Sequence, residues 1–211
     1  MKGYLESTFF FDWETPSLKD KIKELTAGLS TPHERAKALF YFVRDAIRYN
    51  PYTPKDSPEE FRASRTLVRG EGYCVQKAVL LVAMARGAGI PARLGFAIIR
   101  NHLMPPKLLK VMGTDIFPWH GYAELHLGKR WIKATPAFDI EMCNKYDILP
   151  VEFDGIKDAK FHPRDRHGRP HIEYLLDRGP FEDLPFVEIQ RALEERRLLR
   201  PPEDAHKDSW T

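Results

Sequence analysis

The stretch that decides the fold is residues 69–96, RGEGYCVQKAVLLVAMARGAGIPARLGF. Cys74 follows a glycine-containing turn and begins a long apolar run that is typical of a buried helix. Gly89 and Pro91 end that helix, and residues 92–99, ARLGFAII, predict a strand. Because unpaired N–H groups and the helix dipole stabilise a thiolate at a helix N-terminus, we expect Cys74 to be a reactive thiol with a lowered pKa.

Helices are predicted upstream of this stretch. Residues 31–49, TPHERAKALFYFVRDAIRY, open with Thr31 as the N-cap and Glu34 three positions later, which is a capping box. Apolar residues then recur at helical spacing, so one face of this helix is expected to pack inward. Residues 57–70, SPEEFRASRTLVRG, repeat the start signal and predict a second helix that Gly70 closes.

Residues 120–136, HGYAELHLGKRWIKATP, alternate apolar and polar side chains and predict a β-hairpin. Gly128 and Lys129 fit a two-residue turn. With this turn, Glu124 lies opposite Lys133, and these two residues form a favourable cross-strand charge pair that supports the register.

The hairpin places two hydrogen-bond acceptors diagonally across from His120. Thr135 is one, and Asp139 is the other if the strand continues past Pro136. A cysteine at a helix N-terminus, a strand histidine and an acceptor on the adjoining strand make up a thiol catalytic triad of Cys74, His120 and the acceptor. We expect Asp139 to be the third member, because a carboxylate stabilises an imidazolium better than a hydroxyl does, and Thr135 is the alternative.

The rest of the chain carries weaker patterns. Residues 101–118 contain two adjacent prolines without a clear period and predict a loop. The chain is expected to be loop-rich from Asp139 to residue 171, and to form a helix after Pro185. Residues 201–211 are expected to be a frayed tail.

Four motifs in this order resemble the transglutaminase-like superfamily of cysteine enzymes: GYC, ARGAGIPAR, HGYAE and WIKATP. The resemblance covers about residues 31–139. It implies an α+β fold with a papain-like transglutaminase core, in which the cysteine helix packs on an antiparallel sheet. It also implies that Cys74 is the nucleophile and His120 the general base. Where this chain has Thr135, the family usually has an aspartate.

The residues and the resemblance together predict thiol-dependent acyl transfer on an amide bond of a peptide or protein substrate, as a peptidase, deamidase or transamidase. The Cys74 backbone N–H is one expected donor to the oxyanion; the sequence does not identify the second donor, for which Gln76 and Tyr73 are candidates. A catalytically inactive binding module with the same fold is the alternative hypothesis, and Thr135 is the feature that favours it.

The composition of the chain excludes some classes of function. The 211 residues carry 33 basic and 30 acidic side chains, and this interspersed charge argues against a nucleic-acid surface. Without a long apolar run or a signal peptide, we expect a cytoplasmic protein that does not engage membranes and keeps Cys74 and Cys143 as free thiols. We expect a single transglutaminase-like domain over residues 1–211, with its core at about 31–139 and an extension at 140–211.

One cluster of polar residues near the C-terminus suggests a metal site. Its members are His162, Asp165, His167 and His171. Their spacing fits no standard zinc pattern, and they lie in a charged segment that contains proline and glycine. We therefore expect neither a metal nor a cofactor.

Overall fold

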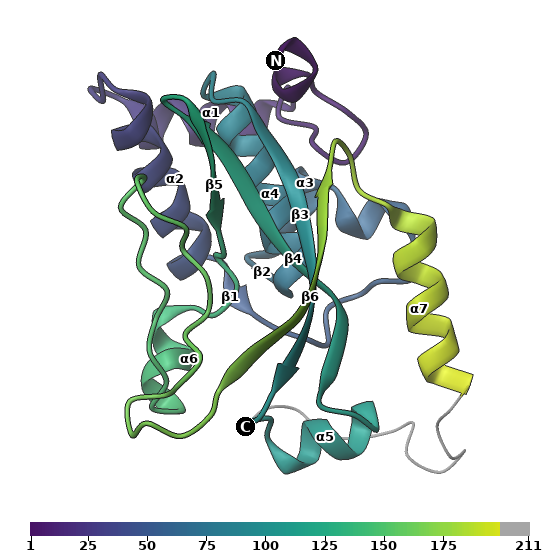
Figure 1. Cartoon of the computed structure of the whole chain (residues 1–211). Helices are drawn as coiled ribbons and strands as arrows, with labels where there is room; N and C mark the ends of the chain where they lie inside the picture. The colour runs from purple at the N-terminus through teal and green to yellow at the C-terminus, as the bar shows by residue number, and fades with distance from the viewer. Residues whose placement is uncertain (199–211) are drawn as a thin grey trace.

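The computed structural model describes residues 1–198, and only the backbone of residue 111 and residues 196–198. Helices and strands alternate along the chain (Figure 1). The helices are α1 (Pro16–Thr26), α2 (Pro32–Asp45), α3 (Ala63–Arg69), α4 (Cys74–Gly87), α5 (Pro106–Met112), α6 (Ile140–Lys145) and α7 (Phe186–Leu198), with 3-10 turns at Lys2–Leu5 and Pro58–Phe61. The strands are β1 (Arg48–Tyr49), β2 (Glu71–Gly72), β3 (Ala92–Asn101), β4 (Ile116–Leu127), β5 (Arg130–Ala134) and β6 (Ile172–Phe181).

Four strands form one antiparallel sheet in the order β5-β4-β3-β6. Figure 1 shows α4 behind this sheet, where it packs on β3 and β4. A separate parallel pair, β1 and β2, lies beside the N-terminus of α4. The predicted α+β fold, with the cysteine helix on an antiparallel sheet, is confirmed.

Helix α4 forms the centre of the core. Every residue from Cys74 to Arg86 is buried, as expected for a helix that is covered on all sides. Gly89 has a φ of +76° and ends the helix in the left-handed conformation that favours glycine. Within this apolar helix, the Lys77 ammonium donates to the carbonyl oxygens of Arg44 and Ile47, at 2.9 and 2.5 Å.

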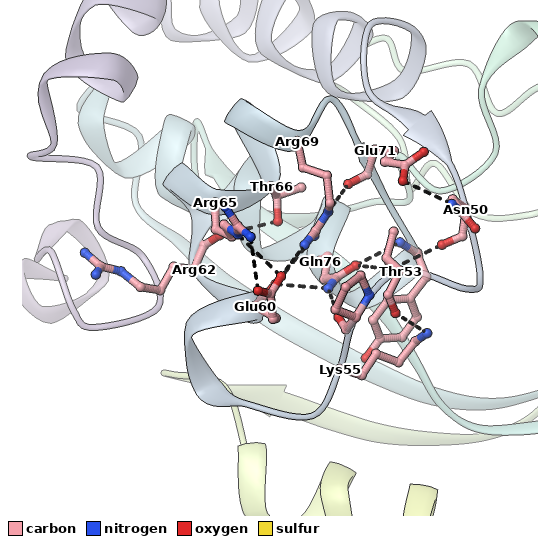
Figure 2. Close-up of polar contacts among 12 residues, drawn as sticks. Asn50, Thr53, Lys55, Glu60, Arg62, Arg65, Thr66, Arg69, Glu71 and Gln76 are labelled. Carbon is pink, nitrogen blue, oxygen red and sulfur yellow. Dashed lines mark hydrogen bonds and ion pairs between the residues drawn. The ribbon is translucent and has the colours of Figure 1, made fainter.

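The two upstream helices differ in how well they match the prediction. In α2, the Thr31 hydroxyl and the Glu34 carboxylate form the predicted capping box. The single helix predicted over residues 57–70 is wrong, because Arg62 is extended and separates a 3-10 turn from the short α3. The carboxylate of Glu60 does not cap a helix here, and it binds the Arg69 guanidinium at 2.7 Å (Figure 2).

The hairpin register is confirmed, since Glu124 lies opposite Lys133 across β4 and β5. The predicted ion pair between them is wrong. Glu124 accepts from the Arg93 guanidinium at 2.7 Å, while Lys133 binds Asp177 of β6. Cross-strand register sets which Cα atoms face each other, but β3 supplies a different partner for Glu124 and β6 a different partner for Lys133.

Pairing between β4 and β5 ends at Ala134. Beyond it, the Thr135 N–H donates to the carbonyl oxygen of Ala159 at 3.0 Å, so the chain leaves β4. Pro136 follows and has no N–H with which to continue a ladder. The strand therefore does not reach Asp139.

The predicted loop at residues 101–118 is wrong, because it contains α5 and the first residues of β4. Pro106 occupies the first helical position of α5, and Gly113 ends the helix with a φ of +69°. The adjacent prolines therefore mark a helix start. The predicted C-terminal helix is confirmed as α7, and the predicted tail at residues 201–211 lies outside the described residues.

Strand β6 was not predicted from the sequence. It forms one edge of the sheet and pairs only with β3, with two register shifts along the way. Near its end, Gly179 has a φ of +82° and Pro180 follows. No helix in residues 1–198 is long and apolar enough to cross a membrane.

Candidate active site

Cys74 is the first residue of α4, and the turn before it is held in place by β1 and β2. The turn needs a glycine, because a Cβ on Gly72 would lie 3.2 Å from the Gln76 Cβ and from a Thr66 methyl group. The short strand pair and this close approach together aim the Cys74 side chain at the sheet. Only 7% of Cys74 is exposed.

The residues next to Cys74 and His120 meet where α4 crosses β4. Gly121 follows His120, and a Cβ on Gly121 would lie 3.0 Å from the Cα of Val75. The backbone N–H groups of Gly121 and Val75 both act to lower the pKa of the Cys74 thiol. The structure therefore brings the N-terminus of α4 against the backbone that carries His120.

The predicted lowering of the Cys74 pKa is wrong for this closed structure. Burial raises the pKa of the thiol to about 11, although the N–H groups of Gly121 and Val75 and the charge of Lys55 act in the opposite direction. A thiolate without a nearby imidazolium loses its hydration inside the protein, and that loss exceeds the effect of the helix N-terminus.

His120 is 1% exposed and lies in β4, opposite Ala97 of β3. Burial lowers the pKa of His120 to about 3, so its ring is neutral at neutral pH. The ring packs against Phe161, with 4.9 Å between the ring centroids. Its Nε2 atom is buried and has no hydrogen-bond partner among the residues that the structure describes. The site therefore holds a neutral thiol and a neutral imidazole.

Neither residue expected to orient His120 is bonded to it in the described residues. The two carboxylate oxygens of Asp139 accept from the Met142 and Tyr49 N–H groups at 2.8 and 2.7 Å, so Asp139 caps α6 and ties it to β1. The Thr135 hydroxyl is buried and has no hydrogen bond of good geometry within the described residues, but it interacts with the Tyr174 hydroxyl and opposes the rise that burial causes in the Tyr174 pKa. Burying a polar group without a partner is unfavourable, so the unbonded Nε2 of His120 is exceptional.

Gln76 is not available as an oxyanion donor. Its amide oxygen accepts from the Thr53 hydroxyl at 2.6 Å, and its amide nitrogen donates to the carbonyl oxygens of Pro54 and Glu60 at 2.9 and 3.0 Å (Figure 2). Gln76 thus clamps the loop between β1 and α3 onto α4. The other expected donor, the Tyr73 hydroxyl, is buried without a partner.

Lys55, which the sequence analysis did not single out, lies near the thiol. Its ammonium donates to the carbonyl oxygens of Pro51 and Thr53 at 2.6 and 2.8 Å and sits 4.8 Å from the centre of the Tyr73 ring. The positive charge of Lys55 opposes the effect of burial on the pKa of the Cys74 thiol. An isolated lysine in a loop gives no sequence signal for this role.

The polar residues near the C-terminus make separate contacts. His162 contacts the Pro150 carbonyl oxygen at 3.1 Å, and Asp165 binds Arg169 at 2.6 Å. His167 contacts Asp147 instead. No group of three possible metal ligands occurs in residues 1–198.

Comparison with protein families matches residues 19–136 to the transglutaminase-like superfamily. Among solved structures, a "Putative Cysteine Protease from Cytophaga hutchinsonii" has 17% identity and a TM-score of 0.49 over 63% of this chain and 40% of its own. A "putative protease from Parabacteroides distasonis" has 15% identity and a TM-score of 0.43 over 63% of this chain and 26% of its own. This chain thus spans less than half of either protein. A search of curated proteins found no match.

Proposed function

Because the chain belongs to the transglutaminase-like superfamily, we propose that it is an acyl-transfer enzyme that acts on amide bonds, with Cys74 as the nucleophile and His120 as the general base. The observation that carries the proposal is the meeting of α4 and β4. There, Gly121, the residue after His120, packs so closely on Val75, the residue after Cys74, that a Cβ on Gly121 would lie 3.0 Å from the Val75 Cα.

Because the Cys74 thiol and the His120 imidazole are both neutral, the first chemical step includes a proton transfer between them. The Cys74 sulfur attacks the amide carbonyl carbon while the His120 imidazole accepts the thiol proton. The Cys74 backbone N–H stabilises the oxyanion. The C–N bond then breaks, the amine leaves with the proton from His120, and a thioester remains. Water or an amine attacks the thioester, and the thiol is regenerated.

Thr135 is the positioning residue for His120 in this proposal, in preference to Asp139. Thr135 stands one residue beyond the last pair of the hairpin, and within the described residues neither its hydroxyl nor the His120 Nε2 has a hydrogen bond of good geometry, although the hydroxyl interacts with Tyr174. A small movement on substrate binding would let each satisfy the other, whereas both oxygens of Asp139 are already occupied.

A catalytically inactive binding module is the second candidate function. Two observations favour it: Cys74 and His120 are almost fully buried, and burial keeps both side chains neutral. This candidate predicts peptide binding without turnover. It also predicts that binding is unchanged when Cys74 is replaced.

The deciding experiment measures both labelling and turnover. The protein is treated with a peptidyl vinyl sulfone and weighed intact by mass spectrometry, and cleavage of a casein digest is followed in parallel. We expect one adduct and new cleavage products with the parent and with Cys143→Ala. Cys74→Ala should give neither. Turnover that survives in Cys74→Ala would exclude the thiol mechanism, and binding without any turnover would favour the inactive module.

A further inference from the structure

A cavity of about 500 Å³ lies beside the candidate active site, between the first residues of β6 and the segment that leads into that strand. Its walls include Phe161, Ile172 and Tyr174. The His171 N–H donates to the Pro163 carbonyl oxygen at 2.9 Å and holds the two sides of the cavity together. The volume lies within the range of about 300–1,000 Å³ that is common for ligand pockets.

The cavity shares two walls with His120. The Phe161 ring centroid is 4.9 Å from that of His120, and the Tyr174 centroid is 6.2 Å from it. Two residues that line the cavity therefore also contact the imidazole ring. An extended peptide advances about 3.4 Å per residue, so a side chain within a few residues of the reacting amide reaches this cavity.

The lining is mainly apolar. Phe161, Ile172 and Tyr174 supply aromatic and aliphatic surface, and Pro163 and Pro170 lack backbone N–H groups. Water in such a cavity finds few donors, so its replacement by apolar carbon is favourable. The lining suits a large aliphatic or aromatic side chain.

The rim of the cavity carries one carboxylate and one ammonium group. The carboxylate of Glu173 contacts His102 at 3.0 Å and Arg100 at 3.5 Å. Lys160 is exposed, and its ammonium lies 5.4 Å from the centre of the Tyr174 ring, with no carboxylate paired to it in the described part of the chain. A carboxylate on the ligand would find Lys160 available.

Most of this cavity lies outside the part of the chain that matches the superfamily. The match ends at residue 136, whereas the walls at Phe161, Pro170 and Tyr174 come later. The matched part supplies the cysteine helix and the histidine strand. The residues after 136 supply most of the cavity wall. Substitutions in this wall could change which substrates bind without altering Cys74 or His120.

We infer that this cavity is a specificity subsite that takes a large apolar side chain of a peptide substrate, next to a substrate carboxylate that pairs with Lys160. This inference rests on the proposed function, because it places the bound peptide against Cys74 and His120. It names the substrate class as peptides in which a large apolar residue adjoins an acidic one.

Two variants and two matched controls test the subsite. Pro163→Trp fills the cavity and keeps the carbonyl oxygen that His171 uses, and Lys160→Glu reverses the charge at the rim. Lys157→Trp and Lys157→Glu are the controls. They introduce the same side chains at Lys157, which is exposed, lies three residues before Lys160 and does not line the cavity. The substrates are hexapeptides that carry Gly, Leu or Phe beside Asp, Asn or Lys, with products measured by mass spectrometry.

We expect the parent to prefer Phe or Leu over Gly in kcat/KM, by about tenfold or more, when Asp is the neighbour. Pro163→Trp should remove the preference for the apolar residue. Lys160→Glu should shift the preference from Asp to Lys. Both Lys157 variants should behave like the parent. If the parent cleaves these peptides without either preference, or the two cavity variants change neither, the subsite is refuted while the thiol chemistry stands.

A binding measurement separates the subsite from the proposed function. Calorimetry with Cys74→Ala and the uncleaved Phe-Asp peptide should show binding, which Pro163→Trp in the same background should weaken by about tenfold or more. If binding follows this pattern but the parent never cleaves a peptide, the proposed chemistry fails and the subsite is supported. Absence of binding to Cys74→Ala would overturn the subsite.

Discussion

Gly121 packs on Val75 so closely that a Cβ on Gly121 would lie 3.0 Å from the Val75 Cα. This contact joins the residue after His120 to the residue after Cys74. A Cβ atom there would push against backbone, which cannot rotate away as a side chain can. The absence of a side chain at Gly121 therefore sets how closely α4 approaches β4. The same approach sets the distance between the thiol and the imidazole.

Gly121→Ala should lower kcat by about tenfold, because the Val75 backbone must move by a few tenths of an ångström to admit the Cβ, and that movement misplaces the reacting groups. Overpacking should also lower the free energy of unfolding by about 1–3 kcal/mol. Gly87→Ala is the matched control, since its Cβ would lie 2.6 Å from an Ile22 methyl group at the other end of α4. That variant should lose stability and keep its kcat. Equal kcat values for both variants and the parent would refute this role of the contact.

Alkylation of Cys74 by iodoacetamide should rise with pH and should not level off near neutral pH. Burial raises the pKa of Cys74 to about 11, so the thiolate fraction grows about tenfold per pH unit from pH 7 to pH 10. Cys143, fully buried and with a pKa raised by burial to about 12, should react more slowly throughout. Rates are measured by peptide mass spectrometry. A plateau below pH 8 would mean that an imidazolium–thiolate pair forms already in the free protein.

Thr135→Asp should make Cys74 more reactive at pH 6. A carboxylate diagonal to His120 would favour the imidazolium and raise the His120 pKa, and the imidazolium would in turn stabilise the thiolate. Thr135→Val should lower kcat by about tenfold or more without a comparable change in KM, since the hydroxyl acts through His120. The pH profile of alkylation is the readout that a merely structural role would leave unchanged.

Asp139→Asn is the comparison for the Thr135 variants. Because Asp139 caps α6 and binds the Tyr49 N–H, its replacement should lower the melting temperature. The kcat of the folded variant should remain near that of the parent. A selective loss of kcat in Asp139→Asn would return the positioning role to this carboxylate.

Acid should destabilise the protein partly through His120. Burial lowers the pKa of His120 in the folded protein to about 3, below its usual value of 6.5. Between those two values the unfolded chain binds a proton that the folded protein excludes, so the free energy of unfolding falls as the pH falls from 6.5 toward 3. Urea unfolding at pH 7, 5 and 4 should show a smaller loss for His120→Gln than for the parent.

His171 should contribute in the same direction, because burial lowers its pKa to about 4. The variant His171→Gln should therefore also reduce the acid loss, and the double variant should reduce it further. Acid profiles of both single variants that coincide with the parent profile would show that these rings do not limit stability in acid.

Local patterns in the sequence predicted α4 and the hairpin. The uninterrupted apolar run after Cys74 and the alternation around Gly128 each specify one element within a short window. Two further predictions depended on distant parts of the chain and were wrong. The Cys74 pKa depends on how deeply packing buries the thiol, and the Glu124 partner depends on a neighbouring strand that brings Arg93 within 2.7 Å.

The packing of Phe161 and Tyr174 against His120 could not be predicted from the sequence. Phe161 and Tyr174 are about forty and fifty residues away from His120 along the chain and lie at either side of a segment without any period. Long-range contacts of this kind leave no local trace. The position of the third triad member also depends on a long-range contact. The chain leaves the hairpin at Thr135 because the Thr135 N–H donates to the Ala159 carbonyl oxygen.

The irregular end of β6 also bears on how the protein behaves at high concentration. An edge strand with free N–H and C=O groups can pair with the same strand of another molecule and start aggregation. In β6 the left-handed Gly179, the N–H-free Pro180 and the register shifts against β3 interrupt such a ladder. The exposed Leu176 lies on this same strand, so these irregularities limit intermolecular β-pairing where an apolar side chain would otherwise promote it.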